Sequence, residues 1–167
     1  MYFLIVAGAM AMLIRGQLAG PNNSLLDPIQ YGQAVTLHGL IMILWFLSPL
    51  AIALANYFVP LQIGAKDLAF PRLNATSYWL YLTSGLLLLG TVFLPGGAPD
   101  TGWTLYAPLN TSQFSPQPGT TLAVLALGML AASVTMSSVN FITTIAKNRA
   151  KGMTWHRLLP YRIHGSA

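Results

Sequence analysis

The sequence contains no cysteine, and only 7% of its 167 residues are charged. The absence of cysteine excludes disulfides, thiolate metal ligands and cysteine-held iron–sulfur clusters within the chain. A soluble domain carries about a quarter charged residues, so this chain has too few to cover a surface that faces water. Hydrophobic residues make up 54% of it, and we therefore expect an integral membrane protein in contact with the lipid bilayer.

Long apolar runs predict an all-α membrane fold, because about 20 residues in a helix cross the hydrocarbon core. Helices are expected at about residues 1–18, 34–60, 78–94 and 120–146. The first run is short and has the composition of the second half of a membrane helix whose beginning is missing. Turn-forming residues fill the connections, which are expected at residues 19–33, 62–77 and 95–119. We expect residues 1–167 to form a single membrane region.

Basic residues are distributed unevenly over these connections. Apart from Arg15, they are Lys66, Arg72, Lys147, Arg149, Lys151, Arg157 and Arg162. All of these fall in the 62–77 connection or in the C-terminal tail, whereas the other two connections contain aspartate and no lysine or arginine. The positive-inside rule predicts that the 62–77 connection and the tail are cytoplasmic. The net charge of +5 then reflects membrane topology and not a nucleic-acid partner.

One imidazole, His38, interrupts the apolar stretch "AVTLHGLIMILWFLSPLAIAL". Ionisable residues within membrane spans are rare and usually functional. The topology puts His38 near the outer end of its helix, at the level of Arg15, and the outer connection brings Trp103 and Tyr106 to that side. Imidazole can ligate haem iron, while guanidinium and indole N–H groups suit the haem propionates. The alternative is a packing histidine that bonds to a carbonyl of a neighbouring helix.

A six-coordinate haem needs a second axial ligand, for which this chain has no evident candidate. His156 and His164 fall in the cytoplasmic tail, and Met42 lies one turn from His38 on the same helix. The second ligand is therefore expected from outside the chain.

Amide, hydroxyl and carboxylate side chains gather at the inner ends of the helices. They are Asn56, Asp67, Asn74, Ser133, Thr135, Ser137, Ser138 and Asn140. Such groups can hold a file of water that carries protons inward from the cytoplasm, with Asp67 at its mouth. Two alternatives remain open from the residues alone: the hydroxyls can serve helix packing, and Asp67 can be a solvated loop charge.

Several segments, in order, resemble subunit I of the haem–copper terminal oxidases, which are the cytochrome c and quinol oxidases of respiratory chains. They are "TLHGLIMI", "NYFVPLQIGAKDLAFPRLNATSYW", "TGWTLYAPL" and "SVNFITTI". The similarity runs from "LIRGQL" to "KGMTW", and the asparagines around the inner aspartate resemble the class with a D-type proton channel. It implies that the chain is the N-terminal third of a bundle of roughly a dozen helices in a prokaryotic cell membrane.

The resemblance also implies roles for individual residues. His38 would be the metal ligand, coordinating a low-spin haem axially, and the haem would be surrounded by Arg15, Tyr31, Trp103 and Tyr106. Arg15 matches an arginine that contacts the formyl group in haem A enzymes. Haem A is the expected type, with haem B or O as alternatives, because an arginine also suits a haem without a formyl group. Asp67 would be the proton-entry aspartate, and the channel above it would be lined by Asn56, Asn74 and Asn140.

The departures from the family limit what this chain would do alone. The family's second axial histidine, the haem ligand of its oxygen site, its copper-binding histidines, its cross-linked tyrosine and the glutamate at the top of its channel are missing. We therefore expect no catalytic residue here, with high-spin haem and copper present only in a complete subunit. The chain would be a fragment or one part of a split subunit.

The expected function is that of the oxidase, which couples reduction of oxygen to water with proton pumping. The expected partners are the remainder of subunit I, subunits II and III, and cytochrome c or quinol as electron donor. Two alternatives remain: a small stand-alone electron-transfer cytochrome in which two copies of His38 share a haem, and a structural membrane subunit without a cofactor.

Overall fold

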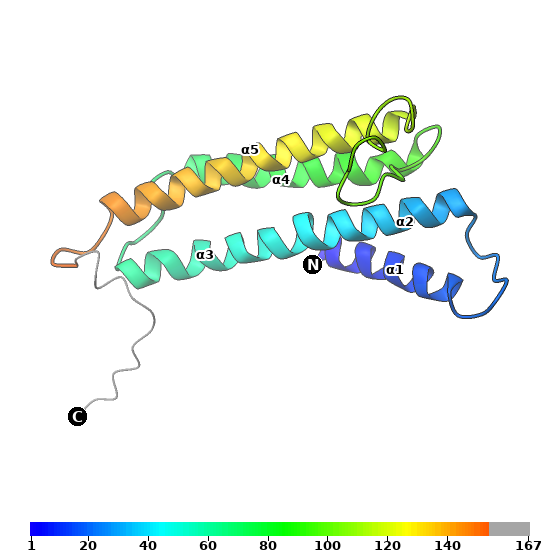
Figure 1. The fold of residues 1–167 in the computed structure, drawn as a ribbon. Helices are drawn as coiled ribbons and strands as arrows, with labels where there is room; N and C mark the ends of the chain where they lie inside the picture. Colours follow the sequence, from blue (N-terminus) through cyan, green and yellow to red (C-terminus); the bar gives the residue numbers. More distant parts are fainter. Residues whose placement is uncertain (154–167) are drawn as a thin grey trace.

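The computed structural model describes residues 1–153 and shows helices packed side by side with their axes roughly aligned (Figure 1). In chain order they are α1 (Tyr2–Gln17), α2 (Pro28–Leu40), the π-helical segment η1 (Ile41–Leu47), α3 (Ser48–Ile63), α4 (Pro71–Gly90), the 3₁₀ segment η2 (Thr91–Phe93) and α5 (Pro118–Lys147). The elements α2, η1 and α3 continue into one another as a single helix of 36 residues. The described part of the chain is thus all-helical, as the sequence predicted.

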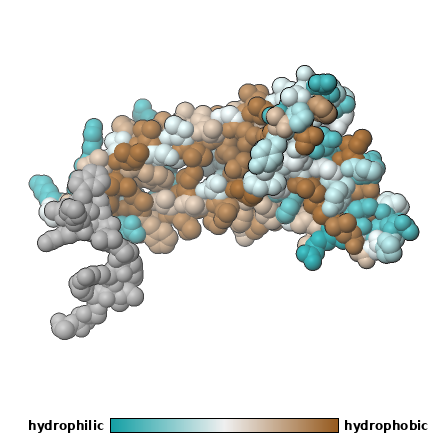
Figure 2. All heavy atoms as spheres, in the orientation of Figure 1, coloured by the Kyte–Doolittle hydropathy of each residue, from teal (hydrophilic) through white to brown (hydrophobic). Residues whose placement is uncertain are grey.

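Three of these helices are long and apolar enough to cross a membrane: Pro28–Ile63, Pro71–Phe93 and Pro118–Lys147. The fourth, α1, is apolar but shorter. Figure 2 shows hydrophobic residues over the middle of the visible face and hydrophilic residues toward the two ends. This distribution matches a bilayer core between two polar interfaces, so the chain is an integral membrane protein with three spans and one short apolar helix.

The helices begin earlier than their apolar runs, because caps and prolines determine where a helix starts. Asp27 forms a capping box, in which its side chain accepts from the Gln30 N–H at 2.8 Å and the Gln30 side chain accepts from the Asp27 N–H at 3.2 Å. Pro28 then occupies the first helical position, where its missing N–H costs nothing. Pro71 opens α4 in the same way, which shortens the connection after α3 to residues 64–70.

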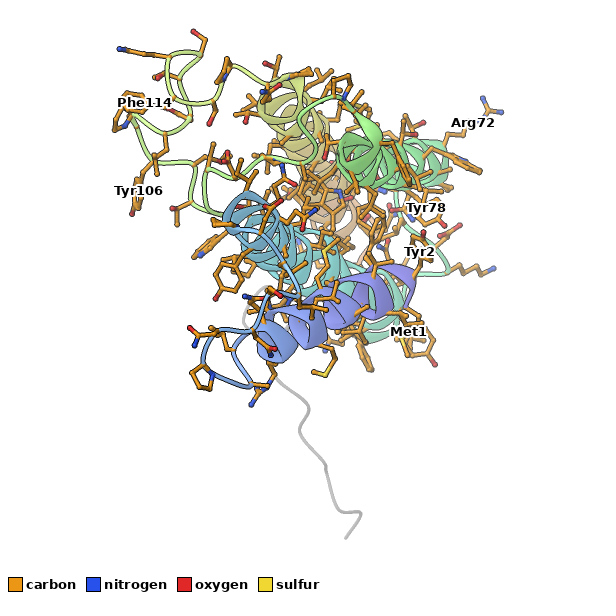
Figure 3. All side chains as sticks on the ribbon, turned by 90° about the vertical axis from the view of Figure 1, so that its right-hand side faces the viewer. Met1, Tyr2, Arg72, Tyr78, Tyr106 and Phe114 are labelled. Atoms are coloured by element: carbon orange, nitrogen blue, oxygen red, sulfur yellow. The ribbon has the colours of Figure 1, made fainter. Side chains whose placement is uncertain are left out.

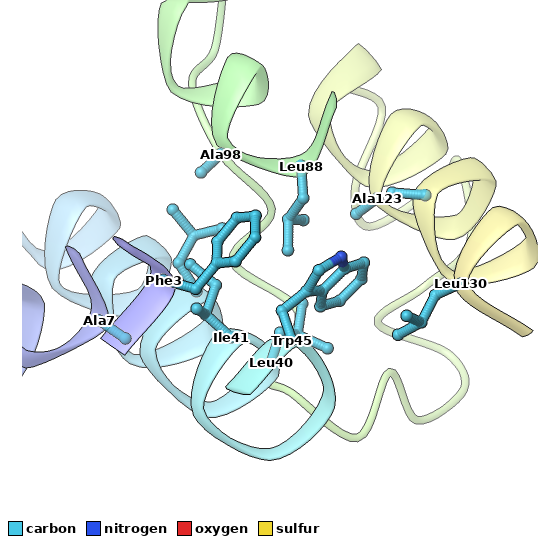
Figure 4. Packing of buried hydrophobic residues seen from close by; sticks show 11 residues of the cluster. Phe3, Ala7, Leu40, Ile41, Trp45, Leu88, Ala98, Ala123 and Leu130 are labelled. Atoms are coloured by element: carbon cyan, nitrogen blue, oxygen red, sulfur yellow. The ribbon is translucent and has the colours of Figure 1, made fainter. Parts of the chain in front are cut away.

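Trp45 lies at the centre of the bundle and is fully buried. Figure 4 shows its ring among Phe3 of α1, Leu88 of α4 and Leu130 of α5. The indole N–H donates to the Ser84 hydroxyl of α4 at 3.0 Å, so the polar edge of the ring is satisfied inside the apolar core. One residue therefore contacts all the other long elements and fixes where the helix that carries it lies.

The long helix widens into a π-helical turn at η1, immediately before Pro49. Pro49 has no N–H, so the carbonyl of Trp45 loses its usual partner one turn later. The hydroxyl of Tyr81, on α4, donates to that carbonyl at 2.8 Å. In a bilayer core an unpaired carbonyl is costly, and α4 thus stabilises the irregular turn of its neighbour.

Removing this hydroxyl should destabilise the bundle. We expect Tyr81→Phe to lower the free energy of unfolding by about 1 kcal/mol, the size of an interhelical hydrogen bond in a membrane. Tyr57→Phe is the matched control, since Tyr57 is exposed and makes no such bond. The measurement is thermal unfolding of the purified protein; equal midpoints for the two variants would contradict the role assigned to Tyr81.

Candidate functional site

The ring of His38 is held by α1. Its Nδ1 lies 2.9 Å from the backbone carbonyl oxygen of Ala7. A carbonyl can only accept, so Nδ1 carries a proton in this contact, and in the neutral form of the ring the lone pair is then on Nε2. Metal-ligating histidines commonly show this arrangement, in which the second nitrogen donates to a carbonyl and orients the ring. The hydrogen bond to a neighbouring helix that is expected of a packing histidine is therefore present. The same bond is compatible with metal ligation by Nε2.

The outer connection folds back onto the helix that carries His38. The Gly102 N–H donates to the hydroxyl of Thr36 at 2.9 Å. Gly39 lies directly against Trp103: a Cβ added to this glycine would be 2.7 Å from the Cβ of Trp103. The indole predicted near the imidazole thus sits on the residue that follows His38. Neither Thr36 nor Gly39 was singled out from the sequence, although both lie in "TLHG".

Tyr31 and Arg15, which were also predicted near the haem, differ in their position relative to His38. Tyr31 is seven residues before His38 on α2, which puts both on one face of the helix. Arg15 is exposed in the last turn of α1. It lies eight residues beyond Ala7 and therefore about 12 Å along the helix from the level of His38. Ala7, and not Arg15, is thus the residue of α1 that contacts the imidazole.

The two aromatic residues predicted near His38 in the outer connection, Trp103 and Tyr106, differ in exposure. Trp103 is 46% exposed and lies against α2, whereas Tyr106 is 72% exposed. Figure 3 shows Tyr106 and Phe114 projecting from the connection away from the helices. The described residues therefore bring Trp103, and not Tyr106, to the helix of His38.

From the centre of the bundle toward its other end, residues of α1, η1, α3, α4 and α5 line an open cavity of about 620 Å³. Its polar lining comes from Asn56, Asn74, Ser77, Tyr81, Ser133 and Ser137, between apolar side chains such as Phe46 and Leu50. The Oδ1 atom of Asn56 is buried and has no hydrogen-bond partner. A buried carbonyl oxygen of this kind requires a donor, and the cavity has room for several water molecules at about 30 Å³ each.

Serine hydroxyls join α4 to α5 beside this cavity. The Ser133 hydroxyl donates to the Ser77 carbonyl at 2.6 Å, and the Ser137 hydroxyl donates to the Ser77 hydroxyl at 3.2 Å. Ser77 in turn donates to the carbonyl of Asn74 at 2.8 Å. The hydroxyls therefore serve helix packing and also line the cavity. Ser77 was not among the residues picked out from the sequence.

Asn140 is fully buried, and its amide is committed to the backbone of the inner connection. Its Oδ1 accepts from the Phe70 N–H at 2.9 Å, and its Nδ2 donates to the Phe70 carbonyl at 3.1 Å. Thr144, one turn further along α5, accepts from the Ala69 N–H at 2.9 Å. Within the described structure Asn140 thus holds this connection against α5, and it is not among the residues that line the cavity.

Asp67 lies in the connection that Asn140 holds. Its side chain is exposed, and its Oδ1 accepts from the N–H of Leu68 at 2.7 Å. The end of α5 is tied to the same region, since the Ala150 N–H donates to the Ile63 carbonyl at 3.0 Å. The carboxylate therefore lies in solvent at the end of the bundle where the cavity is found.

Residues 1–153 contain no group of three or more histidine, cysteine, aspartate or glutamate side chains that could hold a metal ion. His38 is the one histidine within residues 1–153. The tail residues His156, Arg157, Arg162 and His164 lie outside the described residues.

The fold and these sites define a helical membrane protein with an oriented imidazole near one end and, toward the other, a largely apolar cavity that contains amide and hydroxyl groups. The family model for cytochrome c and quinol oxidase polypeptide I matches residues 1–163. The chain therefore belongs to the haem–copper oxidase subunit I family, as the sequence motifs predicted.

Individual relatives agree with this membership. The chain is 56% identical over 156 residues to the haem-copper oxidase subunit I+III of Aeropyrum pernix, covering 93% of this chain and 19% of that protein. It is 50% identical over 156 residues to a putative cytochrome c oxidase subunit 1-beta of Streptomyces coelicolor, covering 93% and 27%. It is 44% identical over 155 residues to the quinol oxidase subunit 1 of Bacillus spizizenii, covering 93% and 24%. The chain thus spans about a fifth to a quarter of the length of these relatives.

Proposed function

We propose that this chain forms the low-spin haem and proton-uptake region of a respiratory oxidase subunit I. The observation that carries the proposal is the 2.9 Å contact between His38 Nδ1 and the Ala7 carbonyl. In the neutral ring, Nε2 then carries a lone pair that can bind a metal, and the ring cannot rotate without losing its hydrogen bond to Ala7. The donor set fits a haem iron, for which a neutral imidazole is a common axial ligand.

His38 would hold the haem, and Arg15, Tyr31, Trp103 and Tyr106 would lie around it. A haem in this position supplies one-electron redox chemistry. The chain's own part is to orient the imidazole through Ala7 and to offer N–H donors to carboxylate groups of the ligand. The haem would be of the A type, with haem B or O as alternatives, since an arginine at position 15 suits each of them.

The inner cavity supports a role in proton uptake. Asp67 can exchange protons with the solvent, while Asn56 and Asn74 offer amide groups to water inside the cavity. Asn140 contributes by holding the segment next to Asp67 in place through Phe70. The connection from α3 to α4 and the end of α5 lie together at this end of the bundle (Figure 1). They carry Lys66, Arg72 and Lys147, so we assign this end to the cytoplasmic side of a prokaryotic cell membrane.

The complete protein would couple reduction of oxygen to water with proton pumping. The remainder of subunit I would provide the second axial ligand, the high-spin haem and the copper site, together with subunits II and III. The electron donor would be cytochrome c or quinol, since relatives named for each are similar to this chain.

A stand-alone haem cytochrome would also use His38, but it would give no role to the cavity and Asp67 at the other end. A structural subunit would bind no haem at all. The experiment that separates these functions is the replacement of His38 in the complete oxidase, with the reduced-minus-oxidised optical spectrum as the readout.

A further inference from the structure

The first part of the outer connection runs along one face of α2. The Gln33 side chain donates to the carbonyl of Gly96 at 2.7 Å, and Thr36 and Gly39 follow at successive turns of the helix. These positions are three residues apart and lie on the same side of the helix. The connection therefore docks along one face of α2, whereas His38, the residue before Gly39, reaches across to α1.

Thr36 forms the hydrogen bond that attaches the connection to α2 midway between Gln33 and Gly39. Its side chain is fully buried, and its hydroxyl donates to the Gly32 carbonyl at 2.8 Å. The same oxygen accepts from the Gly102 N–H at 2.9 Å. Because the hydroxyl proton is directed to Gly32, the oxygen presents a lone pair to Gly102. Gly102 has a φ of +75°, a turn conformation that glycine adopts without strain and that leads directly into Trp103.

Gly39 provides the surface on which Trp103 rests. A Cβ at this position would lie 2.7 Å from the Cβ of Trp103 and 2.9 Å from its Cγ. These atoms are the rigid base of the side chain, so they cannot move away unless the backbone of the connection moves too. The close approach of helix and indole thus depends on the absence of a side chain at Gly39.

We infer that Thr36 and Gly39 are positioning residues that together seat Trp103 against the helix of the haem ligand. Thr36 holds the backbone next to the indole, and Gly39 sets how closely the indole approaches α2. The inference rests on the proposed function in one respect, namely that a haem lies at His38. Trp103 remains 46% exposed, so its N–H is available to a carboxylate at the edge of such a ligand.

Hydrogen–deuterium exchange in the complete oxidase tests the docking of Trp103 on α2 independently of the haem. Thr36→Val keeps the shape of the side chain but removes the acceptor of the Gly102 N–H. We expect amide exchange in residues 99–106 to become at least tenfold faster. Thr36→Ser retains the hydroxyl and should restore the slow rate. Unchanged exchange in Thr36→Val would overturn the inference.

Gly39→Ala tests the contact between Trp103 and α2 independently of the Thr36 hydroxyl. Its matched control is Gly128→Ala, a helical glycine on α5 where an added Cβ meets nothing within 4 Å. We expect Gly39→Ala to lower the midpoint potential of the low-spin haem while haem content stays at the wild-type level, because a donor to a haem carboxylate is displaced. Gly128→Ala should leave the potential unchanged.

The outcomes separate the seat from the proposed function. If Gly39→Ala leaves both the midpoint potential and the amide exchange of residues 99–106 unchanged, Gly39 does not position Trp103 and the inference is refuted. If the connection loosens and the potential does not move, Trp103 is seated but its placement does not serve a haem, and the positioning role is refuted. If the low-spin haem persists when His38 is replaced, the proposed function fails, while the exchange result still decides the seat.

Discussion

Replacement of His38 by asparagine in the complete oxidase is expected to abolish the low-spin haem band and, with it, oxygen-reducing turnover. Asparagine can put an N–H near the position of His38 Nδ1 and so can keep the hydrogen bond to the Ala7 carbonyl. It has no counterpart of Nε2, so the axial ligand is lost while the contact between α1 and α2 is retained. The reduced-minus-oxidised spectrum and the haem content of the purified complex measure the effect.

His38→Ala is the companion variant, because it removes both the ligand and the hydrogen bond. It should lose the same band and in addition lower the free energy of unfolding by about 1 kcal/mol relative to His38→Asn. A low-spin band of normal intensity in His38→Asn would show that the ligand is elsewhere, and that the imidazole serves only helix packing.

Replacement of Asp67 by asparagine should slow proton uptake from the cytoplasmic side and reduce turnover by on the order of tenfold or more, the scale of a lost proton-transfer group. The carboxylate is exposed in the connection between α3 and α4, and asparagine occupies the same space without being able to carry a proton. The low-spin haem band should stay intact, because His38 lies near the opposite end of the bundle. Uptake is measured with a pH-indicator dye during a single turnover.

Lys66→Gln is the control for this experiment, because it removes a neighbouring exposed charge without removing a proton carrier. Its turnover should stay close to that of the unaltered oxidase. Normal uptake in Asp67→Asn would mean that protons enter by another route, and equal slowing in both variants would indicate an effect of surface charge alone.

The fold could be predicted from the sequence to the extent that hydropathy determines it. Apolar runs predicted the spans correctly, but they did not show where the helices begin, which depends on the Asp27 capping box and on prolines such as Pro71. The π-helical turn could not be anticipated, because it depends on a partner distant in the sequence. Pro49 frees the Trp45 carbonyl, and Tyr81 from the next helix pairs with it.

The site was predictable where a side chain carries the signal. His38 stands out in an apolar run, but its partner at Ala7 is a backbone carbonyl, which leaves no trace in the residue type. Likewise, Asn140 was identified as an inner amide, whereas its commitment to the backbone of Phe70 follows only from the fold. The contact with Ala7 puts Arg15 eight residues beyond the imidazole's partner on α1, a relation that aligning the spans by their ends does not reveal.

The contacts around His38 also bear on the order in which the protein can assemble. The Ala7 carbonyl, the Thr36 hydroxyl and the Gly102 N–H all belong to the first 102 residues of the chain. A chain is made from its N-terminus, and early segments can fold before later ones appear. The imidazole can therefore be oriented once α1 and α2 have emerged from the ribosome, and Trp103 can dock on α2 once the connection after α4 follows, before α5 is inserted.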